Sequence, residues 1–228
     1  MATPQELNQL VSSITALLAL PAAQQLLQLN SNTCEHAYEA YVLSLCVEAV
    51  RRAGGTAVLT GINSGANPSP VVFRGAPGSM ASRNQDFAFV DCDLKGKKFE
   101  IHVDVEYQGT SGALHEIDVS MCTKLHAEAV RSTNGSPKTS GNNLLVSLEC
   151  KFYESAPGVT LGRTFVGLVS DCSGVRFEAF VANLPSNKLQ MYFSKKSRPE
   201  PFLGLKPTSP DSENRFIANV QQALLKWA

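Results

Sequence analysis

Two ionisable residues, Glu149 and Lys151, stand two positions apart in the otherwise apolar stretch LECKFY. Side chains along a β-strand alternate between its two faces, so Glu149 and Lys151 would share one face while Cys150 points to the other. Asp118 lies in LHEIDVSMC, which alternates in the same way, and it can reach the same face if the two strands are neighbours. The pattern predicts two carboxylates and one ammonium group close together on rigid backbone.

This set of groups suits the hydrolysis of a phosphodiester bond assisted by a divalent cation. The reaction needs a nucleophilic water and positive charge near the phosphoryl oxygens. Mg²⁺ fits, with Mn²⁺ as a substitute, because it takes one or two carboxylates, keeps several waters and accepts a phosphate ligand. We expect Asp118 and Glu149 to bind the metal, together with the backbone carbonyl of Cys150. Lys151 would orient the attacking water and offset charge in the transition state.

Alternating stretches around these residues predict an α/β protein. A period of two runs through KKFEIHVDVEYQG, LHEIDVSMC and NLLVSLECKFY, which indicates three successive strands, with a short helical stretch, TKLHAEAVR, before the third. A helix, CEHAYEAYVLSLCVEAVRRAGG, precedes the strands, and a helix, VTLGRTFVGLVSDC, and a strand, VRFEAFVAN, follow them. The polar residues of the first strand would form one wet face: Glu100, His102, Asp104 and Glu106.

The length of 228 residues is typical of one α/β domain with extensions. We expect a core at residues 34–183, in the order helix, three strands, helix, strand. Residues 1–30 would add an N-terminal helical extension, with helices in ELNQLVSSITALLAL and AAQQLLQL. Residues 184–228 would add a C-terminal helical extension that ends in DSENRFIANVQQALLKW. Residues 61–85 are rich in Gly, Pro, Ser and Asn and predict a long loop.

Asp118 near the end of one strand and Glu149-Cys150-Lys151 on the next resemble the Asp and Glu-x-Lys signature of the PD-(D/E)XK superfamily, the restriction-endonuclease-like nucleases. The core of that family has the same order of helix, three strands, helix and strand. Ile117 stands where many members carry proline. The resemblance implies a Mg²⁺-dependent nuclease that acts on DNA. The long separation of the two motifs is similar to that in effector nucleases of bacterial defence systems.

The family also implies a role for the helix before the strands. In many members this helix carries a Glu that helps to hold the metal or its water. Glu39 takes the matching place here, and Glu35 competes for the same role.

Charge and composition set further limits. The formal net charge is zero and the pI is near 6.9, so no overall positive field attracts a polyanion, although a local groove can still be basic. The six cysteines lack metal-ligand spacing, no signal-peptide pattern is present, and no apolar run is long enough for a membrane helix. These features favour a reducing cytoplasm and no membrane partner. One group of basic residues could form a patch, although a solvated loop edge is the simpler interpretation. It comprises Lys188, Lys195, Lys196, Arg198 and Lys206.

Several residues allow a second interpretation. Glu149 and Lys151 could be an exposed ion pair on a solvated sheet, worth at most about 1 kcal/mol. Arg163 could contact phosphate or offset the charges of the sheet. Arg74 lies in a glycine-bearing loop that could approach a ligand, although a plain turn is the simpler interpretation. His115 is expected to be a hydrogen-bonded core residue.

For the whole protein, the rival of the nuclease is a non-catalytic module that keeps the fold and binds nucleic acid, a nucleotide signal or a protein. A nuclease that awaits an activating ligand or protein partner is a third interpretation. The apolar N-terminal helices could serve a homo-oligomer. A dimer is expected because many nucleases of this kind dimerise to cut both strands.

Overall fold

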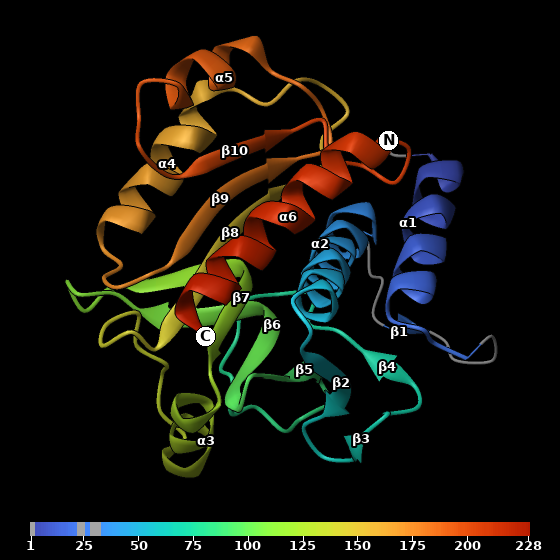
Figure 1. The fold of residues 1–228 in the computed structure, drawn as a ribbon, viewed down its shortest axis with the longest axis vertical. Coiled ribbons are helices and arrows are strands. Elements are labelled where there is room, and N and C mark those ends of the chain that lie inside the picture. The colour runs from blue at the N-terminus through green and yellow to red at the C-terminus, as the bar shows by residue number, and fades with distance from the viewer. Residues whose placement is uncertain (1–2, 22–25, 28–32) are drawn as a thin grey trace.

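The computed structural model describes residues 3–21, 26–27 and 33–228 and shows an α/β protein built on a mixed sheet of eight strands (Figure 1). A separate short pair joins β1 (Leu26–Leu27) to β4 (Val71–Val72). The helices are α1 (Pro4–Leu17), α2 (Thr33–Arg52), α3 (Lys124–Thr133), α4 (Val159–Ser170), α5 (Asn187–Phe193) and α6 (Pro210–Trp227). The strands of the large sheet are β2 (Thr56–Gly61), β3 (Gly65–Ala66), β5 (Ala88–Leu94), β6 (Lys97–Gln108), β7 (Leu114–Thr123), β8 (Leu144–Lys151), β9 (Phe177–Ala182) and β10 (Glu200–Leu203).

From one edge of the sheet to the other, the order is β10, β9, β8, β7, β6, β5, β2, β3. Neighbours from β8 to β3 are antiparallel, whereas β9 is parallel to β8 and β10 is parallel to β9. Parallel neighbours need a crossover, and α4 provides it between β8 and β9. Within the described part of the chain, no helix has both the length and the apolarity that a membrane span requires.

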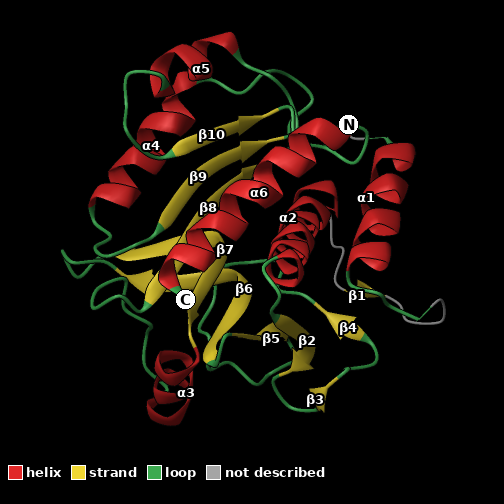
Figure 2. Cartoon of the chain, in the orientation of Figure 1, coloured by secondary structure: helices red, strands yellow, loops and turns green. Residues whose placement is uncertain are grey.

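Helices cover both faces of the sheet (Figure 2). On one face, α2 lies between α1 and α6, and all three share a hydrophobic cluster with Leu148, Ala179 and Val181. The alternate residues of β9, Phe180 and Ala182, pack with α4 and α5 on the opposite face. The strands beneath α2 are therefore buried on both sides, so a charged side chain there must find a partner or a use.

The alternating stretches are confirmed as β6, β7 and β8, and the helix and strand that follow them as α4 and β9. The sequence pattern does not predict β2, β3, β4, β5 or β10, so the order of elements is longer than expected. The two-residue strands β3 and β4 interrupt the loop predicted at 61–85. The region 184–228 is not wholly helical, because β10 forms there; it has only four residues, too few to show a period. At 26–27 the short strand β1 replaces part of the helix predicted in AAQQLLQL, and the rest of that stretch lies outside the described residues.

The predicted wet face of β6 is wrong for three of its four residues. Glu100, His102 and Asp104 are buried, and only Glu106 is partly exposed. For Glu100 and His102 the cause is α3, whose Arg131 donates two hydrogen bonds to Glu100 at 2.6 and 2.7 Å. Asp104 is buried beside Glu39 of α2. A strand covered by helices on both faces can still alternate polar and apolar residues when its polar side chains are paired.

Candidate active site

Asp118, Glu149 and Lys151 come together where β7 and β8 run side by side. Pairing of Val119 with Leu148 places Asp118 opposite Glu149 in register. Lys151 Nζ lies 3.0 Å from Asp118 Oδ2 and 2.9 Å from Glu149 Oε1. The ammonium group therefore bridges two carboxylates, and rigid strands hold all three side chains.

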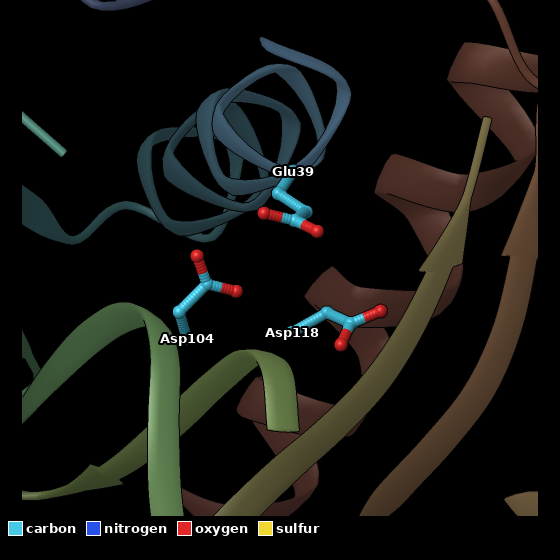
Figure 3. Close-up of side chains that lie close together, drawn as sticks. All are labelled: Glu39, Asp104 and Asp118. Carbon is cyan, nitrogen blue, oxygen red and sulfur yellow. The ribbon is translucent and has the colours of Figure 1, made fainter. Parts of the chain in front are cut away.

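A second group of carboxylates shares Asp118 (Figure 3). Glu39 of α2, Asp104 of β6 and Asp118 of β7 each offer one oxygen, and these oxygens all lie within 4.8 Å of one another. In register, Asp104 stands opposite Asp118, because Val103 pairs with Val119. We call Glu39, Asp104 and Asp118 the acidic triad. Carboxylate oxygens gathered from separate elements in this way can hold a divalent cation.

The backbone of β6 changes its side-chain alternation at Asp104. This residue has a φ of 50°, in the left-handed region that Asp tolerates better than most residues with a side chain. Val103, before it, packs in the cluster that contains α2, whereas Val105, after it, packs in the cluster that contains α3. Asp104 consequently turns toward Glu39 on α2. Backbone held in this region costs about 1–2 kcal/mol and is common at functional sites.

Two oxygens of the acidic triad lack hydrogen-bond partners among the described residues. Glu39 Oε2 and Asp104 Oδ2 are buried, and neither accepts a hydrogen bond from any described residue. Burial, together with the charges of Asp104 and Asp118, raises the pKa of Glu39 to about 11. Burial and the charge of Asp118 raise the pKa of Asp104 to about 7. Buried carboxylates without compensation are costly, so this group fits a ligand that brings positive charge.

Lys151 is cationic at neutral pH although it is largely buried. Burial by itself favours the neutral amine, but Asp118 and Glu149 outweigh it and raise the pKa of Lys151 above its ordinary value. Burial and the charge of Asp118 also raise the pKa of Glu149 to about 7, against the lowering effect of Lys151. Glu149 can therefore exchange a proton near neutral pH while Lys151 keeps its charge.

The two carboxylates predicted to bind the metal lie side by side, but they have different neighbours. Asp118 belongs to the acidic triad, whereas Glu149 lies outside it and pairs with Lys151. The main-chain N–H of Cys150 donates to Asp118 Oδ2 at 2.7 Å, and this bond orients the carboxylate. The role of the Cys150 carbonyl as a metal ligand stays a prediction. Glu39 faces the other acids, as the resemblance implies.

Of the two glutamates proposed for the helix, Glu35 is exposed to solvent, whereas Glu39 lies beside Asp104 and Asp118. Asp104 is the residue that sequence reasoning missed, since it was assigned to a wet face. The signal that could have found it is its place directly across the β6–β7 hairpin from Asp118.

Three other candidates lie away from the acidic triad. His102 Nε2 is 2.9 Å from Glu100 Oε2, on the side of β6 that α3 covers. His115 is hydrogen-bonded as expected, with Nε2 2.6 Å from Asp171 Oδ2, but it is half-buried and not in the core. Arg163 is exposed on α4.

No protein-family model, no curated protein and no solved structure matches the chain. The resemblance to the PD-(D/E)XK superfamily therefore stays a prediction. A function for this protein has to be argued from the geometry and electrostatics of the site.

Proposed function

We propose that the protein is a Mg²⁺-dependent nuclease that hydrolyses phosphodiester bonds in DNA. The observation that carries the proposal is the position of Asp118, which belongs to the acidic triad and also pairs with Lys151. A cation and an ammonium group would then flank one carboxylate, which concentrates positive charge where a phosphoryl group needs it. The succession α2, β6, β7, β8, α4 and β9 supports a restriction-endonuclease-like core.

Glu39, Asp104 and Asp118 are the residues that would hold the cation. Mg²⁺ and Mn²⁺ prefer oxygen ligands, and the buried oxygens of Glu39 and Asp104 that have no partner among the described residues are available as ligands once both groups are ionised. When bound, the cation withdraws charge from phosphoryl oxygens and lowers the pKa of a coordinated water. Glu149 is a further candidate ligand, because Lys151 links it to Asp118.

The remaining groups have roles that follow from their contacts. Lys151 is fixed by two carboxylates before substrate arrives, so it can orient a water and offset charge on the phosphoryl oxygens. Glu149 has a pKa of about 7, which suits a group that takes up the proton released by the attacking water. The N–H of Cys150 keeps Asp118 aligned with both partners.

Cleavage assays with conservative variants test the proposal. The parent should cut DNA in Mg²⁺ or Mn²⁺, and chelation should stop it. Asp118→Asn and Lys151→Gln remove the charge with little change in size, and each should slow cutting by about 100-fold or more. Glu128→Gln, which changes an exposed acid on α3, is the matched control and should cut at the parent rate. Cutting by Lys151→Gln at the parent rate would contradict the assignment of Lys151.

Calorimetry with Mg²⁺ or Mn²⁺ in the absence of DNA separates metal binding from catalysis. Binding that disappears in Asp118→Asn, with no cleavage under any condition, would indicate a non-catalytic module or a nuclease that awaits an activator. Binding that is unaffected by Asp104→Asn and Asp118→Asn would exclude the acidic triad as the metal site. Sedimentation of the intact chain tests the expected dimer independently of both.

A further inference from the structure

Arg74 is a buried cation without a protein acceptor. The residue is only 7% exposed, and its guanidinium group forms neither a hydrogen bond nor an ion pair with any residue that the structure describes. A guanidinium group carries several N–H donors in a planar fork. None of these nitrogens is among the fully buried polar atoms of the described residues that lack a partner, so the donors stay open to the space beside them and can meet a ligand there.

A cavity of about 500 Å³ lies beside this guanidinium group. Its wall is formed by Arg74, the glycine-bearing loop 75–79, Ser82, Asn84 and Phe87, together with neighbouring loop residues. No acidic residue of the described chain lines it. The volume is in the range of small-molecule sites, and the single charge in the wall is positive, which favours an anion.

The loop that lines the cavity is bonded to the backbone of β6 at Asp104, a member of the acidic triad. The N–H of Gly78 donates to the carbonyl of Asp104, and the N–H of Glu106 donates to the carbonyl of Gly78, both at 3.1 Å. These bonds attach the loop to β6 at the position where the strand changes its alternation. Burial lowers the pKa of Arg74 to about 10, against the raising effect of Asp104, so Arg74 remains charged at neutral pH.

The guanidinium group of Arg74 is held in place before any ligand binds. Its central carbon lies 4.1 Å from the centre of the Phe87 ring, a cation–π contact. On another side, a Cβ added at Gly78 would lie 3.3 Å from Arg74 Nη1, so the glycine leaves room for the group. A cation fixed in this way loses little conformational freedom when it binds a ligand.

We propose that this cavity is a phosphate subsite in which Arg74 holds a phosphate group of a nucleic-acid strand next to the bond that is cut. The identity of the strand as substrate rests on the nuclease function proposed above. Arginine suits this task, because its planar fork binds two phosphate oxygens at once. A metal cation would be repelled by Arg74, and an apolar ligand would leave its donors unsatisfied.

Binding measured without divalent cations tests the subsite apart from catalysis. In EDTA, calorimetric titration with inorganic phosphate and with a short single-stranded oligodeoxynucleotide should show binding to the parent. Arg74→Gln should weaken both interactions by about tenfold or more, because charge-assisted hydrogen bonds are lost. Arg74→Lys keeps the positive charge but loses the planar fork, so its affinity for each probe should lie between those of the parent and Arg74→Gln. Arg163→Gln, at an exposed arginine on α4, is the matched control and should bind as the parent does.

Thermal unfolding of each variant shows whether the fold is intact, and Arg74→Lys replaces Arg74→Gln if the latter does not fold. Equal affinity of the parent and the Arg74 variants overturns the subsite, as does a parent that binds neither probe. Loss of phosphate binding with unchanged oligonucleotide binding would indicate a free phosphate or mononucleotide as the ligand and would overturn the strand assignment. If both probes bind in a way that depends on Arg74 but the protein does not cleave DNA, the phosphate subsite is supported and the proposed nuclease function is contradicted.

Discussion

Two buried carboxylates on the same strand, Glu100 and Asp104, have opposite environments. Glu100 is completely buried, accepts two hydrogen bonds from Arg131, and lies 2.9 Å from His102 Nε2. Burial alone would raise the pKa of Glu100, but Arg131 and His102 outweigh it and lower this pKa to about 2. Asp104 is 2% exposed, its Oδ2 has no partner among the described residues, and its pKa is raised to about 7.

The difference distinguishes a structural charge from a functional one. Glu100 is neutralised inside the protein, and its ion pair joins α3 to the sheet. Asp104 is left uncompensated at a strained position, beside Glu39 and Asp118. Proteins rarely keep an unpaired buried charge without a use, and clusters of this kind mark functional sites. Arg74 is the cationic counterpart, since it forms neither a hydrogen bond nor an ion pair with a described residue.

The largest effect on stability is expected when Glu100 loses Arg131, its partner in the ion pair. Arg131→Ala removes the ion pair of the buried Glu100 and leaves only His102 beside it, so the free energy of unfolding should fall by about 3 kcal/mol. Urea denaturation at neutral pH measures the change. Arg163→Ala, which removes an exposed arginine from a helix, should change it by no more than about 0.5 kcal/mol. A similar small loss in both variants would mean that the Glu100 ion pair does not hold α3 to the sheet.

The next largest effect on stability is expected when a divalent cation binds at Asp104. Ligands that bind only the folded state stabilise it, so Mg²⁺ or Mn²⁺ at about 100 times its dissociation constant should add about 2.7 kcal/mol. Thermal unfolding in EDTA and in excess cation measures the difference. The gain should disappear in Asp104→Asn and persist in Glu128→Gln. A gain that survives Asp104→Asn would place the cation elsewhere.

Without metal, Asp104→Asn should stabilise the protein by roughly 1–2 kcal/mol at neutral pH, because it removes an unpaired buried charge. Asn also tolerates the left-handed backbone, so the strand should not be disturbed. The effect depends on pH with a defined sign. The folded-state pKa of Asp104 is raised from 3.8 to about 7, so ionisation penalises the folded state progressively between these values.

The advantage of Asp104→Asn over the parent should therefore be absent below about pH 4, grow as the pH rises, and become constant above about pH 7. Glu100→Gln provides the opposite case. The pKa of Glu100 is lowered from 4.5 to about 2, so its contribution is present above the ordinary value and is lost as the pH falls toward 2. Urea denaturation of both variants and the parent across this pH range measures the free energy of unfolding. If the differences from the parent change with pH in the same direction for Asp104→Asn and Glu100→Gln, the two carboxylates do not have opposite environments.

Part of the site follows from the sequence, because strand alternation is a local property. A period of two is sufficient to predict β6, β7 and β8 and to place Glu149 and Lys151 on one face. Their contact with Asp118 requires only that β7 and β8 be neighbours. Among the strands that the sequence did not predict, β10 has only four residues, too few to show a period. By contrast, β5 alternates Val90, Cys92 and Leu94 with Asp91 and Asp93, so its sequence does contain the signal.

Asp104 and Arg74 escaped prediction for a different reason. The orientation of Asp104 depends on a left-handed φ that reverses the alternation, and no periodic pattern contains that step. The burial of Arg74 depends on Phe87, which approaches across the loop from a position outside the local turn. Both are tertiary effects, and both produce the unpaired charges on which the functional argument depends.

The smallest effect is expected from Gly78→Ala, which should displace the guanidinium group of Arg74 without removing it. The new Cβ would lie 3.3 Å from Arg74 Nη1, a close contact that a shift of the guanidinium group can relieve. We expect phosphate binding in EDTA to weaken by about threefold, because paired hydrogen bonds to an anion depend on the position of the fork. Gly167→Ala on α4 adds a methyl group in open space and should leave binding unchanged. A loss as large as that of Arg74→Gln would show that the loop backbone itself contacts the anion, whereas no loss would show that Arg74 binds phosphate from a different position.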